Sequence, residues 1–219
     1  MNLDTLFSER ILALPVLLFS IVVHEFAHAY AAYRAGDMTA AYQGRLTLNP
    51  LAHLDPIGTV LIPILQFFGP SNLPLIGWAK PVPVNPLRFR SSEWDIFVSL
   101  AGPGSNFSLA ILSAILLKIL VMTGAVPSPA LQPLVTVLMF FVGINVALGV
   151  FNLIPIPPLD GSRVLYRLLA SARSPLADRY AAIEPYGYFI LILILVTPAS
   201  KLFYWMVHFC LTFLMGFIF

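Results

Sequence analysis

His24, Glu25 and His28 are the residues in this sequence whose types and spacing point most directly to chemistry. On a helix, residues i and i+4 lie on the same face, so the two imidazoles can bind one metal ion. Glu25 lies beside the first ligand and can take a proton from a water molecule that the metal activates. The spacing therefore predicts a catalytic metal site with His24 and His28 as ligands and Glu25 as general base.

The surroundings of this motif strengthen the prediction. It lies inside the apolar run Ile11–Ala32, which has the length and polarity of a membrane span. Two histidines and a glutamate are costly at membrane depth and by default mark a functional site. The alternative interpretation is a chance match with two hydrogen-bonded structural histidines. Such a match is less common within a span, because ionisable residues are rare there.

The composition indicates an integral membrane protein. Hydrophobic residues make up 59% of the 219 residues and charged residues 10%, whereas soluble domains average about 45–50% apolar and about 25% charged residues. The lipid bilayer is therefore the expected partner and solvent. A net charge of +2 gives no reason to expect a nucleic-acid partner. The length permits one compact bundle, so we predict a single membrane-embedded domain over residues 1–219.

The apolar runs predict about five transmembrane helices, because a helix needs about 20 residues to cross the hydrocarbon core. The core spans are expected at about 11–33, 96–122 and 131–154. A C-terminal hairpin is expected at about 182–219. The run 57–68 contains Pro63 and is too short to cross, which favours a short re-entrant segment.

The connecting segments add a small β-strand element to this all-α polytopic membrane fold. Residues 42–48 could pair as a short strand, and the prolines of residues 78–85 favour an extended path. Both lie on the side that we expect to be cytoplasmic.

Basic residues predict the orientation in the membrane, because they collect on the cytoplasmic side. With five crossings, the loop after the first span, the loop after the third span and the C-terminus share one side. Nine of the twelve basic residues lie in these two loops: Arg34, Arg45, Lys80, Arg88, Arg90, Arg163, Arg167, Arg173 and Arg179. The N-terminus is therefore expected outside, and the C-terminus and the active site toward the cytoplasm.

A catalytic zinc site usually has three protein ligands and an open position. Asp160 is one candidate, because it follows the third core span on the side where the first span ends. The prolines before it break the helix, which is tolerable at membrane depth around a protein-lined cavity. His53 is another candidate: it could be the third ligand, orient a ligand from behind, or simply cap the re-entrant segment.

Three motifs on successive spans resemble the site-2 protease family of intramembrane metalloproteases, in the compact prokaryotic form. They are His24-Glu25-x-x-His28, Ala101-Gly102-Pro103-Gly104-Ser105-Asn106, and Asn152-x-x-Pro155 followed by Leu159-Asp160-Gly161. The resemblance covers essentially the whole chain and implies a zinc endopeptidase, with one Zn²⁺ per chain, that cleaves transmembrane segments of membrane proteins. It also implies a prokaryotic plasma membrane.

The resemblance assigns roles to the motif residues. His24, His28 and Asp160 would be the zinc ligands and Glu25 the base. The oxyanion needs the metal and a nearby donor. Asn152 or Asn106 could supply that donor or bind the substrate backbone, and the alternative is that both cap helix ends. An unwound substrate could add as a strand to an enzyme edge, which we expect at residues 42–48 and 78–85.

Two other functions are compatible with part of the pattern. A metal-ion or proton transporter would also use intramembrane histidines and carboxylates, and a broken helix suits such a pathway. The outer halves of the spans, however, offer no second set of polar residues to continue it. An inactive membrane chaperone with the same fold would not need Glu25. Nothing in the sequence indicates an oligomeric state.

Overall fold

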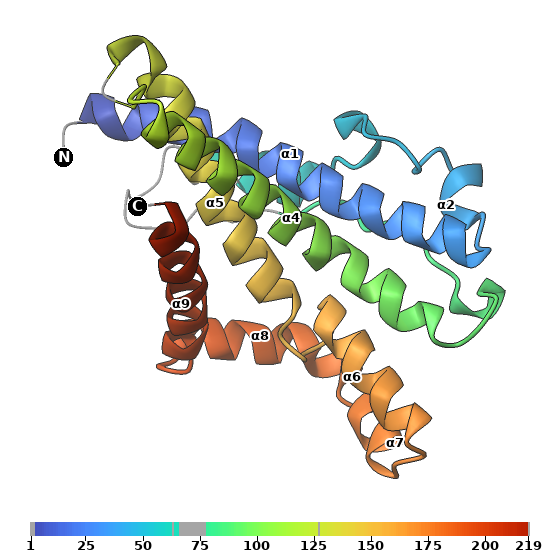
Figure 1. The fold of residues 1–219 in the computed structure, drawn as a ribbon. Helices are drawn as coiled ribbons and strands as arrows, with labels where there is room; N and C mark the ends of the chain where they lie inside the picture. The colour runs from blue at the N-terminus through green and yellow to red at the C-terminus, as the bar shows by residue number, and fades with distance from the viewer. Residues whose placement is uncertain (1–2, 63, 66–77, 127, 219) are drawn as a thin grey trace.

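A computed structural model describes residues 3–62, 64–65, 78–126 and 128–218, and this part of the chain is helical with irregular connections (Figure 1). The longer helices are α1 (Leu3–Ala35), α4 (Trp94–Met122), α5 (Gln132–Asn152), α6 (Asp160–Ser171), α8 (Gly187–Val196) and α9 (Ser200–Ile218). The short ones are α2 (Thr39–Tyr42), η1 (Pro50–Ala52), η2 (Pro56–Leu61), η3 (Pro86–Arg88), η4 (Pro129–Leu131), α7 (Leu176–Ala181) and η5 (Glu184–Tyr186).

The prediction of an all-α polytopic membrane protein is confirmed for the described residues. Five segments are long and apolar enough to cross a membrane: Ile11–Ala35, Trp94–Met122, Pro129–Asn152, Leu176–Val196 and Ser200–Ile218. They match the five predicted spans to within a few residues, except that the fourth begins about six residues earlier. The single domain over residues 1–219 stays a prediction.

Helices α1, α4 and α5 form the core that positions the site. Helix α4 packs against both α1 and α5, and α1 also contacts α5 (Figure 1). His28 contacts Val98 near the start of α4, whereas His24 contacts Asn106 two turns later, so α4 runs antiparallel to α1. Helix α9 covers the outer side of α4 and α5, where Phe203 and Met206 pack against a buried cluster that includes Val146.

The predicted β-strand element is wrong, because no strand forms among the described residues. Residues 42–48 are the end of α2 and a turn in which Gly44 adopts a φ of +65° and its N–H bonds to the Ala41 carbonyl. Residues 78–85 lack regular structure up to the start of η3. Their N–H groups bond to isolated partners, including the carbonyls of Gly58 and His53. Within the described residues, no neighbouring strand supplies the repeated partners that a sheet ladder needs.

The segment predicted to be re-entrant is described only in part. Its first residues form the short helix η2, which Asp55 caps by accepting hydrogen bonds from the N–H groups of Ile57 and Gly58. Residues 63 and 66–68 lie outside the described residues. The re-entrant path of residues 57–68 therefore stays a prediction.

A break between α5 and α6 places Asp160 beside α1. The chain leaves the helix after Asn152 and starts α6 at Asp160, and Pro155, Pro157 and Pro158 lie between the two. Gly161 permits the tight return, because a Cβ there would lie 2.2 Å from the Leu153 carbonyl oxygen.

Candidate metal centre

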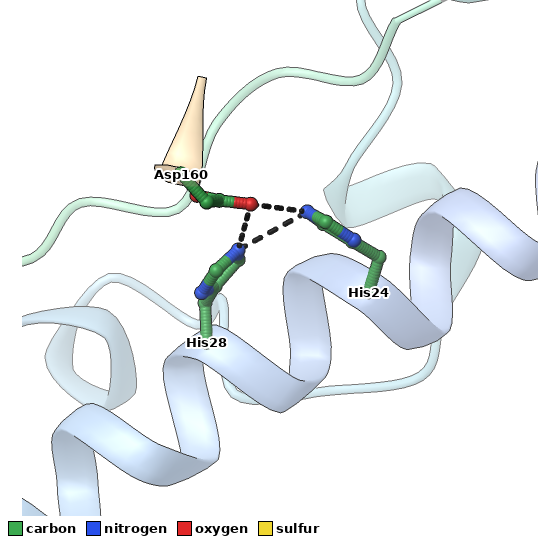
Figure 2. Close-up of side chains that lie close together, drawn as sticks. All are labelled: His24, His28 and Asp160. Carbon is green, nitrogen blue, oxygen red and sulfur yellow. Dashed lines mark hydrogen bonds and ion pairs between the residues drawn. The ribbon is translucent and has the colours of Figure 1, made fainter. Parts of the chain in front are cut away.

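His24, His28 and Asp160 point toward one another from two helices (Figure 2). The two Nε2 atoms lie 3.1 Å apart, and Asp160 Oδ2 lies 3.2 Å from each of them. Both imidazoles are nearly buried, with exposed fractions of 7% and 9%. The structure thus brings the two residues of α1 together with a carboxylate that lies 132 positions after His28.

The hydrogen bonds of the two Nδ1 atoms determine which ring nitrogens are free to bind a metal ion. His28 Nδ1 lies 2.7 Å from the carbonyl oxygen of Val98, and His24 Nδ1 lies 2.7 Å from Asn106 Oδ1. Both oxygens can only accept a hydrogen bond, so each Nδ1 carries the proton. In the neutral imidazoles the Nε2 lone pairs then face one another and the carboxylate oxygen. These lone pairs repel one another, and a bound cation would remove the repulsion.

The separations fit zinc in particular. Bonds of about 2.0 Å at tetrahedral angles place two ligand atoms about 3.3 Å apart, close to the three separations observed here. Two nitrogens and one carboxylate oxygen are also a donor set that zinc accepts, and three protein ligands leave one position open. His24, His28 and Asp160 could therefore hold one zinc ion.

Gly102 makes room for this triangle. A Cβ at this position would lie 2.3 Å from His28 Nε2 and 2.6 Å from His24 Nε2. Helix α4 therefore approaches the two ligand nitrogens with bare backbone. Any larger residue would occupy the place where the imidazoles meet.

Burial raises the pKa of the Asp160 carboxyl, but when His24 and His28 are protonated on both ring nitrogens, their hydrogen bonds and positive charges lower it more. The net result is a pKa well below the usual range for Asp. The carboxylate is thus ionised at neutral pH and ready to act as a metal ligand.

Glu25 lies on the turn of α1 that carries the two candidate histidine ligands, and its carboxylate is held from outside the helix. The backbone N–H of Val82 donates a hydrogen bond to Glu25 Oε2 at 2.8 Å. The segment 78–85 is itself anchored, because the Lys80 N–H bonds to the His53 carbonyl and Arg45 Nη2 donates to the Lys80 carbonyl. The predicted base is therefore held by a loop that we predicted from the sequence to lie, like the active site, on the cytoplasmic side of the membrane.

The remaining predicted site residues lie around this centre. Asn106 is fully buried behind His24, whereas Asn152 bonds to the Leu148 carbonyl of its own helix at 3.0 Å. His53 is buried, and its Nε2 lies 2.8 Å from the Thr47 carbonyl oxygen. Among the described residues, no hydrogen bond joins His53 to the three candidate ligands. Its placement supports the loop that holds Glu25.

Sequence reasoning missed two polar side chains that belong to the centre. Ser20 and Asn145 are both fully buried: Asn145 Oδ1 accepts a hydrogen bond from Asn106, and the Ser20 hydroxyl accepts one from Asn145. The signal that could have found Asn145 is an amide within a long apolar run, since polar side chains inside a span tend to bond across helices.

Comparison with known proteins places the chain in a family. The sequence pattern of Peptidase family M50 matches residues 67–195, which include Asp160. The chain belongs to this family. The resemblance to site-2 proteases stated above is thereby confirmed, and this M50 protein is an integral membrane metallopeptidase.

Curated relatives of this M50 protein match most of its length. It is 38% identical over 194 residues to YwhC of Bacillus subtilis, covering 86% of this chain and 82% of the relative. It is 33% identical over 205 residues to Rip2 of Mycolicibacterium smegmatis, covering 91% of this chain and 74% of the relative. Both relatives carry the description "putative zinc metalloprotease". No solved structure matches the chain.

Proposed function

We propose that this M50 protein is a zinc-dependent endopeptidase that hydrolyses peptide bonds within transmembrane segments of other membrane proteins. The observation that carries the proposal is the placement of His24, Glu25 and His28 inside a helix long and apolar enough to span the membrane, with Asp160 closing a triangle of zinc-compatible dimensions. A site at that depth meets substrates that are themselves embedded in the bilayer. The transporter interpretation lacks a comparable supporting observation.

The residues of the centre supply the steps of hydrolysis. Zinc held by the three ligands would polarise the scissile carbonyl and bring the pKa of a coordinated water to about 7. Glu25 then accepts the proton of the attacking water and returns it to the leaving amine. The N–H of Val82 donates a hydrogen bond to Glu25 Oε2 and thereby restrains where this carboxylate lies.

The substrate must present an unwound backbone, because helical carbonyls are hydrogen-bonded and covered by side chains. Residues 78–82 lack regular secondary structure and reach Glu25 through Val82, and among the described residues no strand pairs with them. We propose that substrate backbone adds along this segment, as in strand addition to an exposed edge. Asn152, half-buried at the end of α5, is the proposed donor to the substrate or the oxyanion.

Asn106 has a different role in this proposal. Its oxygen accepts from His24, and its nitrogen donates to Asn145 and to the Ser20 carbonyl. With a fully buried amide and no spare donor directed at substrate, Asn106 orients a ligand. The predicted alternative of an oxyanion or substrate contact is therefore kept for Asn152 alone.

The membrane orientation is part of the proposal. The basic loops after α1 and after α5 would lie in the cytoplasm of a prokaryotic cell, together with the C-terminus, and the N-terminus would lie outside. The ligand half of α1 and the start of α6 then face the cytoplasmic side. A transmembrane protein substrate would reach the centre from the bilayer.

The test compares wild type with Glu25→Gln for zinc content and for cleavage of reconstituted single-span substrates. Glu25→Gln should retain one zinc per chain and cleave at least about 100-fold more slowly, as expected for loss of a general base. Asp160→Asn should lose both zinc and cleavage. Equal cleavage by Glu25→Gln, or a wild-type protein that binds no zinc, would contradict the proposal.

A further inference from the structure

Three side chains form a hydrogen-bonded chain behind His24 that joins α1, α4 and α5. Ser20, Asn106 and Asn145 have exposed fractions of 0%, and we refer to them as the buried amide chain. Asn106 Nδ2 lies 2.8 Å from Asn145 Oδ1, and Asn145 Nδ2 lies 2.8 Å from Ser20 Oγ. All three lie within candidate membrane spans. Water is scarce at that depth, so these groups must satisfy one another.

A backbone carbonyl identifies the orientation that the Asn106 amide has in this structure. A carbonyl oxygen can only accept, and the Ser20 carbonyl oxygen lies 3.3 Å from Asn106 on the side assigned to Nδ2. The nitrogen must therefore face Ser20, and Oδ1 must face His24. This is the orientation in which Asn106 accepts the Nδ1 proton of His24.

The orientation of Asn145 is fixed in the same way. Its Nδ2 lies 2.9 Å from the Phe141 carbonyl oxygen, so Oδ1 is turned toward Asn106. The Ser20 hydroxyl donates to the Val16 carbonyl at 2.7 Å and keeps a lone pair to accept from Asn145. Each hydrogen bond in the buried amide chain therefore has a defined donor and a defined acceptor. Turning over either amide would place two donors or two acceptors opposite each other.

From this polarity we infer that Asn145 is a positioning residue for the metal centre. It holds the Asn106 amide in the orientation that keeps the His24 proton on Nδ1. The lone pair of His24 Nε2 then faces Asp160 and His28 and is free for zinc. If the Asn106 amide turned over, its NH₂ group would face His24 Nδ1, the proton would move to Nε2, and His24 could no longer serve as a ligand through that atom.

Asn145 supplies the shorter of the two hydrogen bonds that Asn106 Nδ2 donates. Without it, Asn106 Nδ2 keeps the Ser20 carbonyl at 3.3 Å and loses the 2.8 Å contact. Outer partners of this kind fix the tautomer and ring orientation of metal-bound histidines, and their loss typically weakens metal affinity by about 10–100-fold. The inference rests on the proposed metal site, and it adds a residue on a helix that contributes no ligand.

The first experiment reads the tautomer without any metal. The full-length protein, labelled with ¹⁵N-histidine and freed of zinc by chelation, is compared as wild type and as Asn145→Leu by NMR at a pH where both imidazoles are neutral. We expect His24 to hold its proton on Nδ1 in wild type and to shift toward Nε2 in the variant. His28 is the internal reference, because its Nδ1 bonds to the Val98 carbonyl and should not change.

The second experiment measures zinc affinity in a double-mutant cycle of Asn145→Leu and Asn106→Leu. If Asn145 acts through Asn106, the double variant binds zinc no more weakly than Asn106→Leu alone. A residue that merely packs the helices would add its own loss to that of Asn106→Leu. Thr136→Val on α5 is the matched control, since Thr136 is half-buried and, among the described residues, its hydroxyl bonds only to the Gln132 carbonyl of its own helix.

A milder variant covers the case in which Asn145→Leu fails to fold. Asn145→Asp keeps the shape, and a buried carboxyl is expected to be protonated. It can then donate one hydrogen bond and still accept from Asn106, so the His24 tautomer and the zinc affinity should stay near wild type. A wild-type tautomer in Asn145→Leu, or additive losses in the cycle, would overturn the inference. The tautomer result is informative even if the protein cleaves no peptide, which separates this inference from the proposed function.

Discussion

Val82 donates its backbone N–H to Glu25 Oε2 at 2.8 Å, although the two residues lie 57 positions apart. The contact joins the predicted base to a loop that is tied to η1 and to Arg45. The position of the Glu25 carboxylate therefore depends on that loop as well as on α1.

Replacing Val82 with Pro tests this dependence. The substituted proline would lack the N–H, and because Val82 already precedes Pro83, its backbone favours the extended conformations that a proline ring allows. We expect zinc content to be unchanged and kcat to fall by about 10-fold or more, since a hydrogen bond to a charged group contributes about 1.5–3 kcal/mol. Val82→Ala keeps the N–H and should behave as wild type. Faster cleavage by Val82→Pro would mean that the contact restrains Glu25 from acting.

Replacing Gly102 with Ala should abolish zinc binding. The new Cβ would lie within 2.6 Å of both ligand nitrogens and would force the imidazoles apart. Gly104→Ala is the matched control on the same helix, because a Cβ there meets nothing within 4 Å. Zinc content by elemental analysis should fall from one per chain to none in the first variant only. Full zinc content in Gly102→Ala would contradict the placement of the site.

Removing zinc should lower the thermal stability of the wild-type protein in detergent. A ligand present at 1,000 times its Kd stabilises the folded state by about 4 kcal/mol. For a chain of this size that corresponds to a fall in Tm of roughly 10 °C on chelation. Gly102→Ala should show no change in Tm with chelator. An equal fall in both proteins would point to an effect of the chelator itself.

Asp37 should make stability depend on pH below neutrality. Burial raises the pKa of this carboxyl, but other interactions lower it by more, so its net pKa is below the usual range. These are the hydrogen bonds from the Asn85 N–H and from the side chain and backbone of Thr39, and the charge of Arg88. The folded pKa is thus below the unfolded value of about 3.9. Asp37 therefore stabilises the fold above that value, and its contribution is lost as the pH falls through the folded pKa.

The matched variant is Asp37→Asn, which cannot ionise. At pH 7 it should be less stable than wild type, because Asp37 Oδ2 accepts from the Asn85 N–H at 2.7 Å in a fully buried position. The difference in Tm between the two proteins should shrink as the pH is lowered from about 5 toward 3. A difference that is the same at every pH would show that the carboxylate charge is not involved.

The local half of the centre could be predicted from the sequence, because the spacing of His24 and His28 on a helix fixes their common face. Asp160 could be placed by counting spans, which brought it to the level of α1. The interpretation of residues 42–48 as a strand failed, because a short apolar alternation does not supply a pairing partner. Gly102, Ser20 and Asn145 escaped prediction because their roles depend on how α1, α4 and α5 are rotated about their axes, which a one-dimensional pattern does not encode.

The order of the ligands along the chain also affects how the enzyme is made. His28 and Asp160 are separated by 132 positions, and ribosomes add about 5–20 residues each second. The histidine pair therefore enters the bilayer on the order of ten seconds before its carboxylate partner is synthesised. During that interval the Val98 carbonyl and the Asn106 amide oxygen emerge first and can accept hydrogen bonds from the two Nδ1–H groups, so the imidazoles are oriented before the site can close. A nascent chain that stalls before α6 would consequently have the two imidazoles but no carboxylate to complete the candidate metal site.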